Sequence, residues 1–156
     1  MTSRLFPGPA SSSAPIIPRS FATYAPAGER PVVRHLAGYD DFASWCPRVG
    51  ADPASLASDL DALIAFVRDR KNDIKAEELE DQASIFFGNV LVQQRNDADW
   101  MQCGDHFSSA GNERQRFDAK AAIWHLADSD AEMLRTSLDM LHCWISDETT
   151  SWPKPQ

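Results

Sequence analysis

Two pairs of potential metal ligands lie far apart in the sequence. Cys103 and His106 have the spacing Cys-x2-His, and His142 and Cys143 are adjacent. Zinc is held by four such ligands in a tetrahedron, so two separated pairs supply enough groups for one ion. However, neighbouring residues on a helix point about 100° apart, and the second pair lacks the usual spacer. We therefore expect no metal or other cofactor, a buried apolar role for Cys143, and a solvated or helix-end role for His142.

A cysteine nucleophile is a second chemistry that these residue types allow. Cys103 would attack, with His106 or His125 as the base, and this requires a thiol pKa lowered by positive surroundings. The neighbourhood of Cys103 is instead acidic, with Asp99 and Asp105 close in sequence. Acidic neighbours raise a thiol pKa, so the sequence argues against this nucleophile.

Other enzyme signatures are absent from the sequence. Paired acids such as Glu77 and Glu80 have the types needed for acid–base catalysis, but acids on helix surfaces are normally solvated. The chain has no P-loop, no glycine-rich dinucleotide turn, no HExxH and no GxSxG. We therefore predict a protein that is not an enzyme.

Charge is distributed unevenly along the chain. Residues 1–37 contain four arginines and one glutamate, net +3, whereas residues 38–156 contain eleven basic and twenty-two acidic side chains, net −11. Such a body repels nucleic acid and attracts a basic protein partner, although acidity also serves solubility alone. The partner-binding residues that we predict are acids near an expected hairpin: Asp97, Asp99, Asp105 and Glu113.

Length and composition indicate one globular domain. The 156 residues are 43% hydrophobic and 24% charged, and they contain no run of eighteen apolar residues, so no membrane span is expected. No secretory signal is apparent. Three cysteines without a close pair favour a reducing compartment, and we expect a cytoplasmic protein.

The two ends of the chain are expected to be tails. Residues 1–31 hold most of the prolines together with Ser11-Ser12-Ser13, and they are predicted to be a disordered tail, extended in part and without a helix. An alternative function follows, in which this tail docks an adaptor or assembly subunit on a larger complex. Leu5-Phe6 or Ile16-Ile17 is also a candidate for docking on a partner or on the domain itself. The globular domain is predicted at 32–147, followed by a flexible tail at 148–156 in which Trp152 is a candidate anchor.

A long buried helix over 76–95 is the predicted centre of this domain. Its apolar residues cover more than half of its circumference, so it should be packed from two sides. Acids fill its first turn, which suits the positive end of the helix dipole. Gly88 in its middle costs about 1 kcal/mol relative to alanine, and this favours either the close approach of another backbone or simple drift.

The remaining pattern gives a helix-dominated α+β domain with a small antiparallel sheet. Asp52-Pro53 predicts the start of a helix over 53–71. Further helices are expected at 118–127, capped by Asp118, and at 130–146, opened by a capping box from Ser129 to Glu132. Shorter elements are an edge strand at 32–36, a helix at 40–46 stopped by Pro47, and strands near 98–103, 106–108 and 114–117. In the last helix, Met133, Met140 and Trp144 are expected to widen the buried stripe.

Part of this order resembles small bacterial α+β domains of immunity-protein type. The resemblance covers about 52–146 and rests on these residues: Phe86, Gly88, Val90, Leu91, Val92, Trp100, Phe117, Asp118 and Trp124. It implies the fold and, by analogy, an inhibitor that binds a toxin-like partner. We therefore predict a non-enzymatic acidic module that masks a basic surface of another protein.

Overall fold

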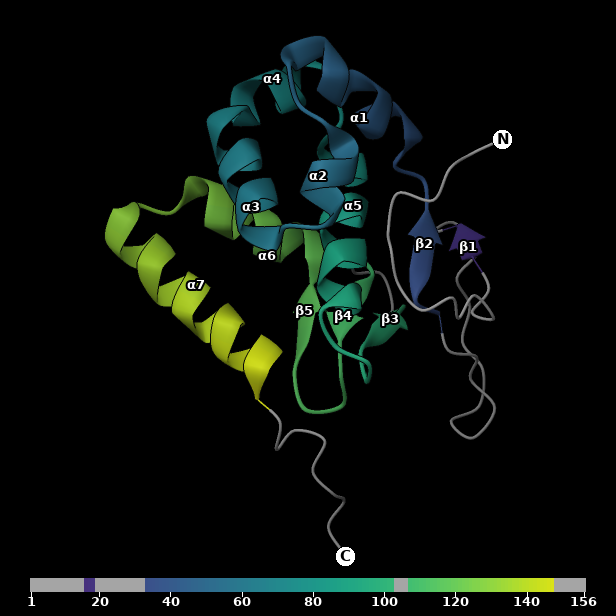
Figure 1. Cartoon of the computed structure of the whole chain (residues 1–156), viewed down its shortest axis with the longest axis vertical. Helices are drawn as coiled ribbons and strands as arrows, with labels where there is room; N and C mark the ends of the chain where they lie inside the picture. Colours follow the sequence, from purple (N-terminus) through teal and green to yellow (C-terminus); the bar gives the residue numbers. More distant parts are fainter. Residues whose placement is uncertain (1–15, 19–32, 103–106, 148–156) are drawn as a thin grey trace, which may run out of the picture.

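The computed structural model describes residues 16–18, 33–102 and 107–147. The helices are α1 (Asp40–Trp45), the 3-10 helix η3 (Cys46–Val49), α2 (Pro53–Ala57), α3 (Leu60–Asp69), α4 (Lys71–Ala76), α5 (Glu80–Gln93), α6 (Ala119–Asp128) and α7 (Ala131–Ser146). The strands are β1 (Ile16–Pro18), β2 (His35–Ala37), β3 (Asp99–Met101), β4 (Ser109–Gly111) and β5 (Arg116–Asp118). The predicted helix-dominated α+β fold is confirmed (Figure 1). No helix in these ranges is long and apolar enough to cross a membrane.

Helix α5 lies at the centre of the core, as predicted. Every residue from Ala83 to Val92 is buried. Helices α3 and α6 pack on α5, and strands β2, β3 and β4 also contact it (Figure 1). The helix begins at Glu80 and not near residue 76, because α4 ends at Ala76 and Glu78 then adopts a left-handed backbone with φ of 58°. The two-sided burial that the apolar pattern predicted is therefore confirmed, with a later start.

The close approach predicted at Gly88 is made by a side chain and not by a backbone. A Cβ built on Gly88 would overlap the six-membered ring of Trp100. The indole is fixed there because its Nε1 donates to Oδ1 of Asn89, 2.8 Å away. Asn89 is fully buried, and it also accepts from the backbone N–H of Leu36 and donates to the Leu36 carbonyl, at 2.8 and 2.9 Å. One buried amide thus joins α5, β2 and β3.

The prediction of a single helix over 53–71 is wrong, because helical structure is interrupted once within this segment and once near its end. Asp52 caps α2 as predicted, and Pro53 is its first residue. Asp59 then opens α3 by accepting from the backbone N–H of Ala62 at 3.1 Å. The chain turns again at Arg70 before α4 begins. The predicted apolar stripe is nevertheless buried throughout: Leu56, Leu60, Leu63, Ile64 and Val67.

The strands form two small sheets. β3, β4 and β5 make an antiparallel sheet in that order, and Trp100 pairs with Ala110 while Ala110 pairs with Phe117. β1 pairs in parallel with β2, so part of the predicted N-terminal tail lies on the domain itself. β2 begins at His35, later than predicted, while Val33 forms an isolated antiparallel bridge with Trp100.

Of three local predictions, one helix cap is confirmed, and the other cap and a helix stop are wrong. Asp118 caps α6 as predicted, accepting from Ala121 at 2.9 Å. The predicted N-cap of the last helix is wrong: Asp130 accepts from the N–H of Met133 at 2.8 Å, while the Ser129 hydroxyl donates to the His125 carbonyl. Pro47 does not stop helical structure, because it lies inside η3 directly after α1.

A preformed groove between the hairpin and the last helix

Three arginines donate hydrogen bonds to carbonyl groups at the C-terminal ends of α5, α6 and α7. Arg34 donates to carbonyls after α5, including that of Ala98 at 2.7 Å. Arg68 donates to the carbonyls of Leu126 and Ser129 at the end of α6, at 2.6 and 2.9 Å. Arg95 donates to the end of α7, as described below. A cation at this position satisfies orphan carbonyls and opposes the negative end of the helix dipole.

These contacts change the charge that the molecule presents to solvent. Within the described ranges there are eleven basic and twenty acidic side chains, net −9. Three of the eleven are the capping arginines, and four more form ion pairs inside the chain: Arg70, Lys71, Lys120 and Arg116. Many acids instead project from helix starts, where carboxylates are favoured. A larger fraction of the basic side chains than of the acidic side chains is therefore held in contacts within the chain.

The predicted partner-binding acids occupy different situations. Asp97 pairs with Arg95, and Asp99 pairs with Arg116 at 2.5 Å on the half-buried sheet surface. Glu113 is exposed on the turn between β4 and β5. Asp105 lies outside the described residues. Of the four predicted acids, Glu113 is therefore exposed to solvent, while Asp97 and Asp99 pair with arginines and help to hold the sheet and its neighbours together.

A cluster around Asn112 joins α5, the hairpin and α7. Arg95 Nη1 donates to the carbonyls of Trp144 and Asp147 at 2.8 and 2.9 Å, and Arg95 Nε donates to Asp97 Oδ1 at 2.7 Å. The guanidinium of Arg95 lowers the pKa of Asp97, and Asp97 in turn raises the pKa of Arg95. Asn112 Nδ2 donates to the other oxygen of Asp97 at 3.2 Å. The C-terminal end of α7 is thus tied to the end of α5 by a partly buried arginine.

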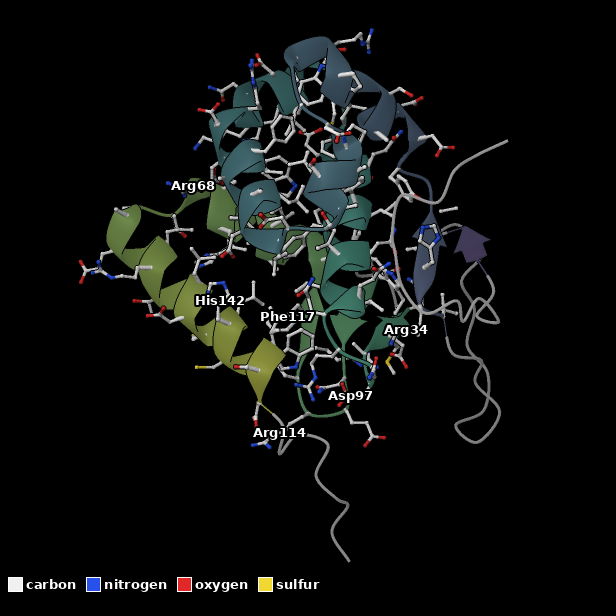
Figure 2. The ribbon with its side chains drawn as sticks, in the orientation of Figure 1. Arg34, Arg68, Asp97, Arg114, Phe117 and His142 are labelled. Atoms are coloured by element: carbon white, nitrogen blue, oxygen red, sulfur yellow. The ribbon has the colours of Figure 1, made fainter. Side chains whose placement is uncertain are left out.

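The same asparagine fixes both walls of a groove. Asn112 Oδ1 accepts from the indole N–H of Trp144 on α7 at 3.2 Å, and from the backbone N–H groups of Arg114 and Gln115 at 3.1 and 2.9 Å. Phe117 packs edge-on against Trp144, with ring centroids 5.2 Å apart. The side chains labelled in Figure 2 place Arg114 and Phe117 beside the C-terminal half of α7. Both walls are therefore held by hydrogen bonds before anything binds.

We call this feature the hairpin groove. It has a volume of about 430 Å³ and is lined by Arg114, Gln115, Thr136, Asp139, Met140, Cys143, Trp144 and Asp147. Trp144 is buried, whereas Met140 is 60% exposed, so the groove has an apolar side open to solvent. Asp139 and Asp147 line it, and Glu113 precedes the lining residue Arg114. The groove therefore combines an apolar surface with an acidic edge.

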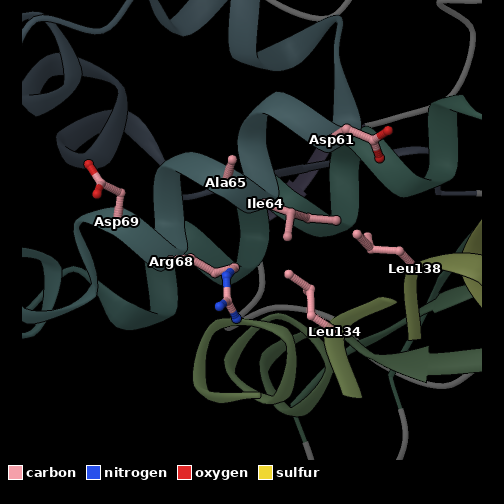
Figure 3. Close-up of a pocket in the computed structure, with 7 residues that line it drawn as sticks. All are labelled: Asp61, Ile64, Ala65, Arg68, Asp69, Leu134 and Leu138. Atoms are coloured by element: carbon pink, nitrogen blue, oxygen red, sulfur yellow. The ribbon is translucent and has the colours of Figure 1, made fainter. Parts of the chain in front are cut away.

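A second groove lies on the other side of α7. It is lined by residues of α3 and α7, has a volume of about 350 Å³, and is shown in Figure 3: Asp61, Ile64, Ala65, Arg68, Asp69, Leu134 and Leu138. Two of its three charged groups already have partners, since Arg68 caps α6 and Asp61 pairs with His142 at 2.8 Å. Its apolar side chains Ile64, Leu134 and Leu138 are core residues that hold α7 to the body. This groove is better explained as the seam along which α7 packs.

The residues considered for metal or thiol chemistry are not brought together in the described part of the chain. Cys103 and His106 lie outside it, while His142 pairs with Asp61. The prediction that Cys143 is buried is wrong, because it is exposed on α7. Cys46 is the buried cysteine, and burial raises the pKa of its thiol to about 12. Among the described residues no group of three or more His, Cys, Asp or Glu side chains is arranged to hold a metal ion.

Sequence reasoning missed Asn112 and misplaced two methionines. Met133 and Met140 were expected to widen the buried stripe, which is wrong: they are 47% and 60% exposed. Their spacing was the available signal. Residues seven apart share a helix face, and Asp147 lies seven residues beyond Met140, so the two methionines share a face with an acid. No family model matches the chain, and no curated protein or solved structure matches it.

Proposed function

We propose that this protein is a non-enzymatic, acidic binding module of inhibitor or immunity type that masks a basic surface of a partner protein. The observation that carries the proposal is the internal use of cations. The capping arginines direct their donors to backbone carbonyls, and the described ranges hold twenty acidic against eleven basic side chains, which leaves an excess of carboxylates on the outside. Such a surface steers a basic partner and disfavours an acidic one.

The end of the molecule that carries the hairpin groove is the surface we assign to this role. Here Glu113 and Asp139 are exposed beside a preformed apolar groove. A charged rim around a desolvated centre is the usual anatomy of a protein interface. A preformed surface also costs little ordering on association.

A pair of charge-reversal variants tests the proposal. The first carries Glu113→Lys and Asp139→Lys at the rim of the groove. The matched control carries Asp40→Lys and Glu77→Lys; both residues are exposed, one at the start of α1 and one directly after α4. These two helices lie at the opposite end of the molecule from the hairpin (Figure 1). Both variants change the net charge by the same amount. Partners captured on the full chain are identified by mass spectrometry, and each is purified and titrated against all three proteins.

The expected result is a basic partner whose binding is lost in the rim variant and weakened only modestly in the control. Its affinity should fall at least tenfold between about 50 and about 500 mM salt, because the screening length shrinks from roughly 14 to roughly 4 Å. An acidic partner, or an affinity that does not respond to salt, would refute masking by charge.

A further inference from the structure

The outer face of α7 carries the strongly exposed large apolar side chains of the described residues. Met133 and Met140 are 47% and 60% exposed and lie seven residues apart. At 1.5 Å per residue they are about 10 Å apart on one face of the helix, and the buried Trp144 lies about 6 Å further along. Methionine side chains are flexible and polarizable, and they are enriched at surfaces that bind other proteins. The two methionines therefore span about two turns of a second helix.

The hairpin groove lies beside Met140, and its walls are held in fixed positions. Trp144 is 5% exposed and is oriented by Asn112 and Phe117, while the opposite wall is held by the two backbone bonds to Asn112. The volume of about 430 Å³ falls within the range of about 300–1,000 Å³ that is typical of binding clefts. A bulky apolar side chain inserted beside Met140 would meet a rigid aromatic floor.

The charges around the groove select the partner. Asp139 lies on α7 and Asp147 is the C-cap residue of that helix, eight positions later and about 12 Å along its axis. Glu113 adds a third carboxylate, against the guanidinium groups of Arg114 and of Arg95, which lies close to Asp147. Cations about two turns apart on a partner helix match this spacing. A second copy of the chain does not, because each copy carries a net charge of −8 and the two surfaces repel.

We infer that the hairpin groove is the seat of a basic amphipathic helix, which packs an apolar side chain against Met140 and Trp144 and places lysines or arginines over Asp139 and Asp147. This inference rests on the proposed function and specifies its partner. The groove walls and the exposed methionine supply the apolar contact, and the acidic edge sets the orientation. The mode is that of a helix laid in a groove and read through anchors at helical spacing.

Three synthetic helices of about 14 residues, roughly 21 Å long, probe the full chain by calorimetry. The first has leucine on one face and lysine on the other. The second replaces leucine by alanine and keeps every lysine, and the third replaces lysine by glutamate and keeps every leucine. The protein variant is Met140→Gln, which removes the apolar contact at an exposed position, and the matched control is Asn72→Ala on exposed α4.

The expected result is that the leucine–lysine helix binds at least tenfold more tightly than the other two. Met140→Gln should weaken it about tenfold, equal to about 1.4 kcal/mol, and Asn72→Ala should leave it unchanged. Equal, salt-sensitive binding of both lysine helices would overturn the groove assignment and leave charge masking intact. Binding of none of them would overturn both proposals.

Two further results would also overturn the inference. Tight binding of the leucine–glutamate helix would show that the acidic edge does not select the partner. A self-association that sedimentation detects in the wild type, and that Met140→Gln abolishes, would show that the row of methionines is an interface between copies.

Discussion

Replacing Asn112 by alanine should detach the C-terminal half of α7 from the hairpin. Asn112 is 2% exposed, and its side chain makes four hydrogen bonds, to Trp144, Arg114, Gln115 and Asp97. The buried indole N–H of Trp144 would lose its partner, at about 1–3 kcal/mol. The two turn N–H groups and the Asp97 carboxylate can bond to water instead, so each should cost only about 0.5–1 kcal/mol. The free energy of unfolding should therefore fall by roughly 3–5 kcal/mol.

Urea denaturation followed by tryptophan fluorescence and far-UV circular dichroism measures this loss. The matched control is Asn96→Ala, because Asn96 is exposed near the same cluster and should change the free energy of unfolding by less than about 0.5 kcal/mol. Hydrogen exchange should also show that amides in the last two turns of α7 lose protection before those of α5. A loss below about 1 kcal/mol, or unchanged protection of α7, would refute the idea that Asn112 holds the groove together.

The other predictions concern the core and the titratable groups. Gly88→Ala should lower the urea midpoint, because the new methyl group meets the anchored ring of Trp100. The cost of this overpacking, about 1–3 kcal/mol, exceeds the gain in helix propensity. An unchanged or higher midpoint would mean that the ring shifts freely. The Asp97 pKa is lowered below its ordinary value of 3.8, so its contribution to stability is present above that value and is lost as the pH falls through the folded pKa. Asp97→Asn should therefore flatten the acid side of the stability profile, and an identical acid limb would contradict this. Iodoacetamide at pH 8 should modify Cys143 and spare Cys46, whose thiol pKa is about 12, until urea unfolds the chain; mass spectrometry of the peptides distinguishes the two sites.

Short-range patterns predicted the parts of this fold that depend on short-range physics. The apolar residues of α5 indicated burial on both sides, and the Asp52-Pro53 and Asp118 starts were visible as caps. The break before α3 was missed because the apolar stripe continues across it. Asp59 is itself a strong cap, and that local signal was overruled by the longer pattern.

The hairpin groove was not predictable in the same way. Its walls come from residues 114–115 and from 136–147, and the side chain of Asn112 bonds to both. Periodicity places Met140 at the edge of the stripe in α7 but does not say which edge a neighbouring element covers. The roles of Asp97 and Asp99 as partners of arginines also depend on contacts that spacing alone does not reveal.

The arginines at the helix ends have a consequence for how the chain folds. They join Arg34 to Ala98, Arg68 to Ser129 and Arg95 to Asp147, across 64, 61 and 52 positions. None of these helix ends is complete within a fragment that contains the helix alone, so secondary structure and long-range contacts must form together. Separations of this size favour slow, all-or-none folding. Lysine cannot replace these arginines, because a single ammonium group lacks the planar set of donors that reaches several carbonyls at once.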